Sequence, residues 1–442
     1  MRILYVVHGF PPDTVGGVEL QCHALATALA ASHAVGVLAW QSDASKPDYA
    51  LEAGRQGALE VWRLNHLFTD LASFSGVYQN ARIDALYDGV LEQWRPDVVH
   101  VQHLIGLSTG ILERTKRRGI PLVLTLHDYW FGCPKGQRIR DPLVVCHEID
   151  RQLCVTCLKP QNYELRAPRS PLGRWLRRAR LPSRRRGLRI LRQYDADMHR
   201  LLALPDAIVT PSRFHREMYA RYGVDLGKAH VLPCGLATAS FAGMARPPAG
   251  HFRVGFLGTL IPSKGAHVLL EAYRLLGRPD VTLDFHGPGL PYHGDTGYGA
   301  RLEAAAATIP GTIRFHGRYD PGDVPRLLAS LDALVVPSLW YESFSLVIRE
   351  GFLAGVPVVA AGHGAMAEAI EDGVSGLLFT PGDPADLARQ LARLLEEPGL
   401  RERLGRHPHE VASIEEVAAR HLELYTSLGD RGRGASSGRP CA

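Results

Sequence analysis

The chain has 442 residues, of which 46% are hydrophobic and 21% are charged, with 45 glycines and 30 prolines. This ordinary globular composition excludes a mainly disordered, fibrous or coiled-coil protein, and the length suffices for two or three domains. The formal net charge of +5 hides an asymmetry, because eleven arginines lie in 165–192, a segment without Lys, Asp or Glu. The remainder is mildly acidic, so the overall charge does not indicate a nucleic-acid-binding protein.

The first 210 residues alternate short β-rich runs with helical patterns, which predicts a parallel sheet with helices on both faces. A strand over 2–7 precedes a helix over 18–31, in which Val18, Cys22 and Leu25 recur on one face. No apolar run is long enough to span a membrane, and the first is too short for a signal peptide, so we expect a cytoplasmic protein. Further strands are predicted over 97–101, 121–125 and 207–210.

The same pattern restarts near residue 251, where a strand runs into a glycine turn and a helix over 266–276 follows. Two doubly wound halves fit the chain length better than one large sheet. We therefore predict domains over 1–236 and 251–405, joined by a linker over 237–250 that is rich in Ala, Gly and Pro. The strands expected in the second half are 251–258, 281–286, 312–316, 333–337 and 356–360.

A terminal helix is predicted within 406–428, because Ser413 and Glu416 have the spacing of a capping box. The tail over 429–442 consists mainly of Gly, Ser and Arg, and we predict that it is disordered.

Two glycine turns lie between a strand and a helix, where open parallel sheets bind their ligands. Gly16 and Gly17 would let the backbone approach an anionic group at a helix N-terminus, although a tight turn without a ligand fits equally well. In the second half, Lys264 stands at the start of a helix with its ammonium free to meet a phosphate. A lysine at such a place is usually only solvated. Whether Lys264 indicates a phosphate site therefore depends on the residues that follow it in the sequence.

A pair of glutamates lies further along the second half. Glu350 falls in an apolar helix for which Ser345 is a candidate N-cap, and a carboxylate there needs a partner such as the vicinal diol of a sugar. The alternative is a glutamate on the helix surface. Glu342, beside the N–H groups of Ser343, Phe344 and Ser345, could hold sugar hydroxyls and a diphosphate together.

These features together resemble the retaining glycosyltransferases of family 4, which have the GT-B fold. The resemblance covers residues 1–425 and rests on Thr-Leu-His127-Asp128-Tyr-Trp, the Gly-Gly turn, Lys264-Gly265, the E-x7-E pair and the segment from Gly362 to Glu368. It implies an α/β protein of two Rossmann-like doubly wound domains that face each other across a cleft. The second domain would hold a nucleotide-sugar donor, the first would hold the acceptor, and the terminal helix would cross back to the first.

The resemblance also implies roles for single residues. Glu350 would hold the ribose hydroxyls, Lys264 the diphosphate, and Glu342 with the following N–H groups the donor sugar and the β-phosphate. His127 would lie near the transferred sugar. Thr259 stands where many members carry Arg, which leaves Lys264 as the side-chain cation, with Arg318 and Arg349 as candidate replacements. The residues implied are, as catalytic, His127, Lys264 and Glu342; as donor-binding, Gly17, Thr259, Lys264, Ser343, Phe344, Ser345 and Glu350; as acceptor-binding, Gly16, Gly17, His127 and Asp128.

The predicted function is transfer of a sugar, with retention, from a nucleotide-sugar to a lipid-linked or saccharide acceptor, in the synthesis of cell-surface polysaccharides or glycoconjugates. A cation and helix N-termini can stabilise the departing diphosphate, so we expect no catalytic metal. The alternatives are a nucleotide-sugar epimerase of the same fold and a non-catalytic protein that binds nucleotide-sugars at a membrane surface.

Two segments of the first half lie outside this scheme. Cys133, Cys146, Cys154 and Cys157 form a cluster that ends in C-x2-C, which suggests a structural zinc, while uncoordinated thiols and disulfides are the alternatives. The arginine-rich insertion over 165–192 interleaves basic and apolar residues, which suits an anionic membrane surface at the inner face of the membrane. A solvated insertion is the alternative, and nucleic acid is not an expected partner. Asp195 and Asp197 mimic a metal-binding D-x-D motif but fall in a helical pattern, so we interpret them as surface charge.

Overall fold

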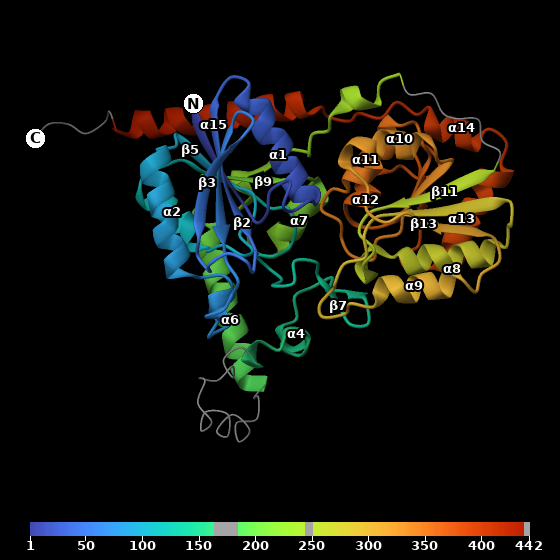
Figure 1. Cartoon of the computed structure of the whole chain (residues 1–442), viewed down its shortest axis with the longest axis horizontal. Coiled ribbons are helices and arrows are strands. Elements are labelled where there is room, and N and C mark those ends of the chain that lie inside the picture. The colour runs from blue at the N-terminus through green and yellow to red at the C-terminus, as the bar shows by residue number, and fades with distance from the viewer. Residues whose placement is uncertain (163–183, 244–250, 437–442) are drawn as a thin grey trace, which may run out of the picture.

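The computed structural model describes residues 1–162, 184–243 and 251–436, which form two α/β halves side by side (Figure 1). Parts of three predicted segments, at 165–183, 244–250 and 437–442, lie outside the described residues. Within the described residues, no helix is both long and apolar enough to cross a membrane.

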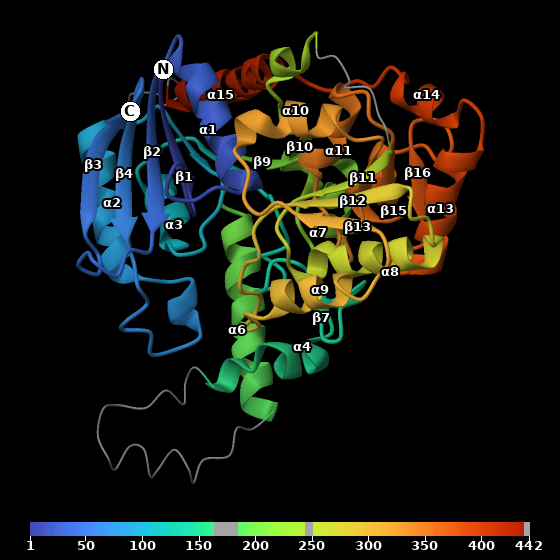
Figure 2. The ribbon, with the colours of Figure 1, turned by 45° about the vertical axis from the view of Figure 1, so that its right-hand side comes forward.

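The first half is built on an eight-stranded sheet in the order β10-β9-β6-β5-β1-β2-β4-β3. The strands predicted in this half are present, and every neighbouring pair is parallel except β3 with β4. A two-residue turn with Gly57 at φ +59° joins those two antiparallel strands, so the sheet is mixed rather than wholly parallel as predicted (Figure 2). The strands are β1 (Arg2–Val7), β2 (Ala34–Gln41), β3 (Leu51–Gln56), β4 (Leu59–Asn65), β5 (Val98–Val101), β6 (Leu122–Thr125), β9 (Ala207–Thr210) and β10 (Ala229–Val231).

Both faces of this sheet are buried, as the continuous apolar strands require. On β1, Ile3 and Tyr5 pack in the core with α1 and the terminal helix, whereas Leu4 and Val6 pack in the core that contains side chains of α2, α3 and α6. The helices of this half are α1 (Gly17–Ala30), α2 (Ala81–Trp94), α3 (Gly110–Arg117), α6 (Arg184–Leu202) and α7 (Arg213–Arg221).

The second half has a six-stranded parallel sheet in the order β13-β12-β11-β14-β15-β16. The turn after β11 brings Lys264 to the end of β14, because Gly265 has φ +73° and an added Cβ would lie 2.0 Å from the Pro337 carbonyl oxygen. Only glycine permits that approach. The strands are β11 (Phe252–Leu257), β12 (Val281–His286), β13 (Thr312–Phe315), β14 (Ala333–Val336), β15 (Val358–Ala361) and β16 (Leu377–Phe379). The helices are α8 (Ala266–Leu276), α9 (Tyr298–Ala306), α10 (Val324–Ala329), α11 (Leu346–Leu353), α12 (Gly364–Ala369), α13 (Pro384–Glu396) and α14 (Leu400–Gly405).

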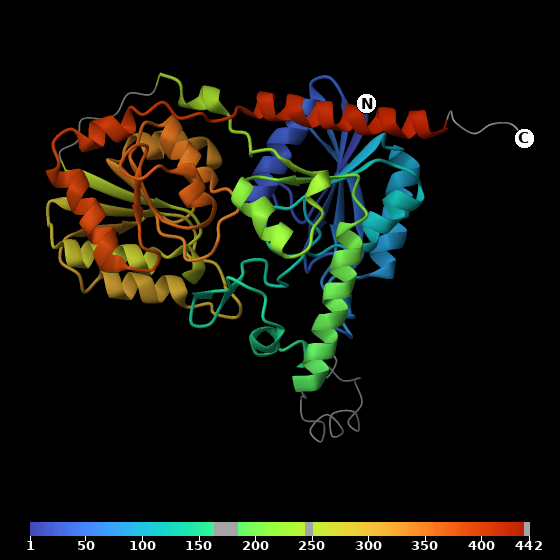
Figure 3. The same cartoon turned by 180° about the vertical axis from the view of Figure 1, so that it is seen from behind.

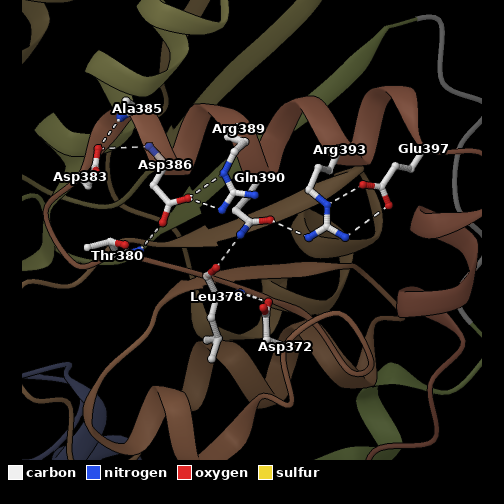
Figure 4. Close-up of polar contacts among 10 residues, drawn as sticks. All are labelled: Asp372, Leu378, Thr380, Asp383, Ala385, Asp386, Arg389, Gln390, Arg393 and Glu397. Carbon is white, nitrogen blue, oxygen red and sulfur yellow. Dashed lines mark hydrogen bonds and ion pairs between the residues drawn. The ribbon is translucent and has the colours of Figure 1, made fainter.

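Helix α13 shows how local polar contacts fix an element of the second half (Figure 4). The Asp383 side chain accepts from the N–H groups of Ala385 and Asp386 and so caps the helix. The buried side chain of Gln390 donates to the Leu378 carbonyl at 2.7 Å, which ties the helix to β16.

The chain leaves the second half after α14 and crosses back to the first half. There the terminal helix α15 (Ile414–Ser436) lies along the first half (Figures 1 and 3). The predicted capping box is formed, since the Ser413 N–H donates to Glu416 at 2.8 Å and the Glu416 N–H donates to Ser413 at 3.1 Å. The helix runs past Gly429, so the prediction of a disordered tail is corrected over 429–436. A helix that is already nucleated propagates cheaply through weak helix formers.

A small subdomain follows β6 and lies below the place where the two halves meet in Figure 1. It contains the hairpin of β7 (Ile139–Arg140) and β8 (Val144–Val145) and the helix α4 (Arg151–Leu158), and we call residues 131–158 the cysteine subdomain. It contacts the second half directly, because Tyr292 donates to Gln137 at 2.7 Å and the Tyr341 hydroxyl lies 2.5 Å from His147 Nδ1.

Candidate active site

The structure brings Lys264 and Glu342 into direct contact at the carboxyl end of the second sheet. Lys264 Nζ donates to Glu342 Oε1 at 2.7 Å, and the same oxygen accepts from Ser338 Oγ at 2.7 Å and from Trp340 Nε1 at 2.9 Å. The side chain of Glu342 is 7% exposed and that of Lys264 is 30% exposed. The carboxylate is therefore held in place, while the ammonium keeps N–H donors for a ligand.

Three backbone donors lie immediately after this ion pair. The N–H groups of Ser343, Phe344 and Ser345 make no hydrogen bond to any residue that the structure describes. Ser345 has φ +65°, and its side chain does not cap α11, so its predicted role as an N-cap is wrong. The turn instead leaves main-chain donors free beside a cation, an arrangement that suits a phosphate.

Of the two candidate replacements for the absent arginine at position 259, Arg349 is already occupied. Its guanidinium donates to the carbonyls of Phe344 and Ser345 and lies over the Phe344 ring. Burial lowers the pKa of Arg349 to about 10. Arg318 is exposed, and Thr259 is half-buried next to the glycine turn. Lys264 thus remains the cation that is placed against the free N–H groups.

Glu350 lies on α11, eight residues after Glu342 in the sequence, and is half-buried. Burial raises the pKa of Glu350 from its ordinary value near 4.5 to about 7. Its carboxyl makes no hydrogen bond or ion pair with any described residue. It lies near the half-buried Tyr319, whose pKa is raised by partial burial and by the charge of Glu350. A buried carboxyl without a partner is expensive unless a ligand supplies donors.

On the other side of the cleft, polar side chains gather after β1, β5 and β6. Asp128 accepts from His103 Nε2 at 3.2 Å, and the His103 ring packs 4.5 Å from the ring of His8. Burial acts to raise the pKa of Asp128, but the charge and hydrogen bond of His103 outweigh it and lower that pKa. His127 contacts Gln102 instead, with Nε2 2.6 Å from Oε1. Burial lowers the pKa of His127 to about 3, so its imidazole is neutral.

The Gly-Gly turn opens α1 as predicted and faces α11 of the second half. A Cβ added to Gly17 would lie 3.6 Å from Leu346 Cδ1, at the start of α11. A Cβ on Gly16 would lie 2.7 Å from Glu19 Oε2. The Glu19 carboxyl is buried in the first turn of α1 and lies 3.4 Å from His8 Nε2, and burial raises its pKa. The N-terminus of α1 therefore already has a carboxyl of its own chain beside it.

Two further contacts close the halves against each other. Ser212 Oγ donates to the Ser343 carbonyl at 2.7 Å, next to the free N–H groups. The Glu368 carboxylate accepts from the backbone N–H groups of Arg213 at 3.1 Å and Phe214 at 2.7 Å, which are at the N-terminus of α7. These bonds join the start of α7 in the first half to Ser343 and α12 of the second half.

Comparison with known proteins decides the family. Residues 15–240 match the sequence model described as Glycosyltransferase Family 4, and residues 245–409 match that described as Glycosyl transferases group 1. The chain belongs to glycosyltransferase family 4. It is a hexosyltransferase, and its donor is a nucleotide-sugar.

Similar proteins span nearly the whole glycosyltransferase chain. It is 27% identical over 424 residues to the glycogen synthase of Mycobacterium tuberculosis, covering 92% of this chain and 89% of that one. It is 29% identical over 340 residues to the MMP alpha-(1->4)-mannosyltransferase of Mycolicibacterium hassiacum, covering 74% and 70% of the two chains. The solved structure of sucrose-phosphate synthase from Thermosynechococcus elongatus aligns with a TM-score of 0.69 at 18% identity, over 98% of this chain and 100% of that one. That likeness shows the GT-B fold, as predicted.

The cysteine subdomain of the glycosyltransferase gathers all four clustered cysteines around one cavity of about 360 Å³. Burial raises the pKa of Cys133, Cys146 and Cys154, and the neighbouring cysteines raise it further. Across the described ranges, no three metal-binding side chains approach closely enough to hold a metal ion. The cysteines are free thiols there, so zinc binding by Cys133, Cys146, Cys154 and Cys157 stays a prediction from the sequence.

Metal analysis of the purified glycosyltransferase tests the zinc prediction. We expect about one zinc per chain, lost in the Cys154→Ser variant, because a tetrahedral site needs all four thiolates. Cys234→Ser is the matched control, since Cys234 is buried away from the cluster and carries no motif. Protein without zinc, whose four clustered thiols react with a thiol reagent, would contradict the prediction.

Several contacts of the site were not predicted. Trp340 and Ser338 fix the Glu342 carboxylate, and their position between the end of β14 and Glu342 was the available signal. Asp197 is not a surface charge, because it is buried and accepts from Tyr78 at 2.9 Å. Asp195 pairs with Arg151 of the cysteine subdomain, and Arg151 Nε donates to it at 2.8 Å. These two aspartates thus anchor α6.

Proposed function

We propose that this glycosyltransferase transfers a hexose with retention of anomeric configuration to an anionic, lipid-linked acceptor. The observation that carries the proposal is the Lys264–Glu342 ion pair beside three free N–H groups, with the unpartnered Glu350 on the helix that follows. Lys264 and the three N–H groups bind the diphosphate. Glu342 binds the donor sugar, and Glu350 binds the ribose hydroxyls. Thr259 and Gly17 lie at the edge of this donor site, and His127 lies by the transferred sugar.

The chemistry follows from where charge develops. As the bond from the anomeric carbon to the phosphate oxygen breaks, negative charge grows on the diphosphate, where Lys264 and the N–H groups stabilise it. The acceptor oxygen attacks the anomeric carbon from the same face and its proton passes to a diphosphate oxygen, so the scheme needs no covalent bond between the sugar and a carboxylate of the chain. In this scheme no metal ion is required for the departure of the diphosphate.

A basic cavity beside the cleft supports an anionic acceptor. It measures about 990 Å³ and lies between the cysteine subdomain and the second half. Lys135, Arg140 and Lys159 line it, and none of them forms an ion pair with an acidic residue of the described chain. The remaining cation, Arg301, is paired with Asp295. The carboxylate of Asp141 also lines the cavity, so the three cations outnumber it and the lining keeps a net positive charge. That charge favours a phosphate group over a neutral saccharide.

An aromatic cavity adjoins the basic one and supports a lipid. It measures about 350 Å³, shares Lys135, Cys157 and His293 with the basic cavity, and is lined by aromatic side chains. The aromatic residues are Phe74, Tyr78, Trp130 and Tyr194. An amphiphile with a phosphate in the basic cavity and an apolar chain in the aromatic one would fit both.

The helix α6 carries exposed arginines close to the cysteine subdomain. In Figure 2 this helix extends beyond both sheets, next to α4. Arg184, Arg185, Arg189 and Arg192 are exposed there, and the preceding arginines lie outside the described residues. We propose that this segment holds the enzyme to an anionic membrane surface at the inner face of the membrane, where lipid-linked precursors of cell-surface polysaccharides are glycosylated.

A donor screen tests the proposed function. The purified enzyme is incubated with UDP-, GDP-, ADP- and dTDP-sugars, with or without detergent-solubilised bacterial lipids, and release of nucleoside diphosphate is followed. We expect release that needs lipid and persists in excess EDTA. Release that EDTA abolishes would contradict the metal-free scheme, and conversion of the donor sugar without any acceptor would indicate an epimerase.

Removing the cations of the basic cavity tests the acceptor assignment. We expect the Lys135→Ala/Lys159→Ala variant to raise the KM for the lipid acceptor at least about tenfold, because each lost charge-assisted contact is worth roughly 1.5–3 kcal/mol. The rate of donor hydrolysis should not change. Lys228→Ala is the control, since Lys228 donates to the Ala203 carbonyl and does not line the cavity. An unchanged KM would place the acceptor elsewhere.

A further inference from the structure

A row of hydrogen bonds leads from the cleft to the terminal helix through the interior of the first half. His127 Nε2 lies 2.6 Å from Gln102 Oε1, and Gln102 Nε2 lies 3.1 Å from His100 Nε2. His100 Nδ1 lies 2.6 Å from the Tyr425 hydroxyl, which lies 2.9 Å from the Tyr5 hydroxyl. All five side chains are buried, and Tyr425 belongs to α15.

The amide of Gln102 fixes the direction of every proton in this row. Its oxygen can only accept, so His127 carries its proton on Nε2 and leaves Nδ1 bare. Its nitrogen can only donate, so His100 Nε2 accepts from it and also from the Thr125 hydroxyl, which lies 2.7 Å from the same nitrogen. His100 Nδ1 then donates to Tyr425. The Tyr425 hydroxyl then donates to Tyr5. Every bond points from the cleft toward the helix, and His127 Nδ1 has no protein partner among the described residues.

The groups around His127 keep the row neutral. His103 and His8 face it from the loops after β5 and β1, His215 from α7 and His421 from α15, and Asp128 follows it in sequence. Burial is the main cause that lowers the pKa of His127. His103, His215 and His421 lower that pKa further, whereas Asp128 raises it. The imidazole thus presents a lone pair rather than a charge.

We propose that Gln102 and Tyr425 are positioning residues for His127, holding it as the Nε2-protonated tautomer so that Nδ1 accepts a hydrogen bond from a hydroxyl of the transferred sugar. The sugar contact rests on the proposed function, whereas the tautomer rests on the hydrogen bonds alone. The terminal helix is then part of the active site, because Tyr425 brings its hydroxyl to the end of the row. The first half without α15 would lack the hydrogen bond from His100 to Tyr425.

Replacing Gln102 with glutamate should change the pH dependence of kcat. The replacement of a residue that only supports the fold would not change it. The added carboxylate beside His127 raises the pKa of that imidazole, so the acid limb of the kcat profile moves to higher pH by about one unit or more. Gln390→Glu is the matched control, because Gln390 is also buried but lies on α13, away from the cleft. We expect no shift for that control. A Gln102→Glu enzyme with the wild-type pH profile would overturn the proposal.

Two further variants keep the proposal testable if that protein folds poorly. Gln102→Leu and Tyr425→Phe should both lower kcat by about tenfold while the donor KM changes less than twofold, without moving the acid limb. Tyr87→Phe is the control for a buried hydroxyl, since Tyr87 bonds Thr115 at 2.6 Å in the core of the first half. Equal kcat values in Tyr425→Phe and the wild type would remove Tyr425 from the proposal.

Nitrogen NMR of the histidine-labelled full chain separates this proposal from the proposed function. The His127 signal, assigned by its loss in His127→Ala, should show the neutral Nε2-protonated tautomer in the wild type and a mixture of tautomers in Gln102→Leu. A wild-type Nδ1-protonated tautomer would overturn the proposal whatever the activity. A donor screen without any release would instead count against the proposed function and leave the tautomer result standing.

Discussion

Substituting Lys264 by methionine should slow sugar transfer by about 100- to 1000-fold, the usual cost of removing one donor from developing negative charge in a water-excluded site. Methionine keeps the length of the side chain and removes its charge. The buried Glu342 carboxylate would also lose the ion pair that now orients it at 2.7 Å. The measurement is kcat from release of nucleoside diphosphate with the donor that the screen identifies.

Lys46→Met is a matched control for this loss. Lys46 is also 30% exposed and forms an ion pair of 2.6 Å, but its partner Glu52 is 50% exposed and lies at the edge of the first sheet. We expect that variant to keep wild-type kcat. Because Lys264 and Glu342 touch, the double variant Lys264→Met/Glu342→Gln should lose less than the product of the single losses. Fully multiplicative losses would mean that the two residues act separately.

Glu350→Gln should stabilise the protein at pH 8 while it weakens donor binding. The folded-state pKa of about 7 lies above the ordinary value of 4.5, so the folded protein binds this proton more tightly than the unfolded chain does. The stability that this group contributes is present below pH 4.5 and is lost as the pH rises through 7, up to about 3 kcal/mol. Glutamine removes that loss, and it also removes the carboxylate that would hold the ribose hydroxyls.

Thermal unfolding and donor titration together check this prediction. The gain in melting temperature of Glu350→Gln over the wild type should be clear at pH 8 and nearly absent at pH 4.5. The donor Kd at pH 8 should rise at least about tenfold, since bonds to a charged acceptor are worth roughly 1.5–3 kcal/mol. Glu303→Gln, on the exposed surface of α9, should change neither quantity. Unchanged donor affinity in Glu350→Gln would remove this residue from the donor site.

The sequence by itself determined the fold class and marked Glu342 and Glu350 as candidate site residues. Buried parallel strands are short continuous apolar runs, so β1, β6, β11 and β12 are visible in composition alone. Glu342 and Glu350 stand close in sequence, and their chemistry depends on a local turn and one helix. Local spacing is the information that a single sequence carries, and the capping box at Ser413 was found for the same reason.

The tertiary structure decided the contacts that join distant segments. The ion pair of Lys264 with Glu342 spans 78 residues, and the bond of His100 to Tyr425 spans 325. Neither has a period or a spacing that marks it in the sequence, because long-range pairings are set by how whole elements pack. The burial of Asp197 escaped prediction for that reason, because its partner Tyr78 lies 119 residues away. The antiparallel β3 pairs locally, and it escaped prediction because its residues are mostly exposed and form no apolar run. The sequence shows which residue types are available for a site. The packing of whole helices and strands determines which of these residues come into contact.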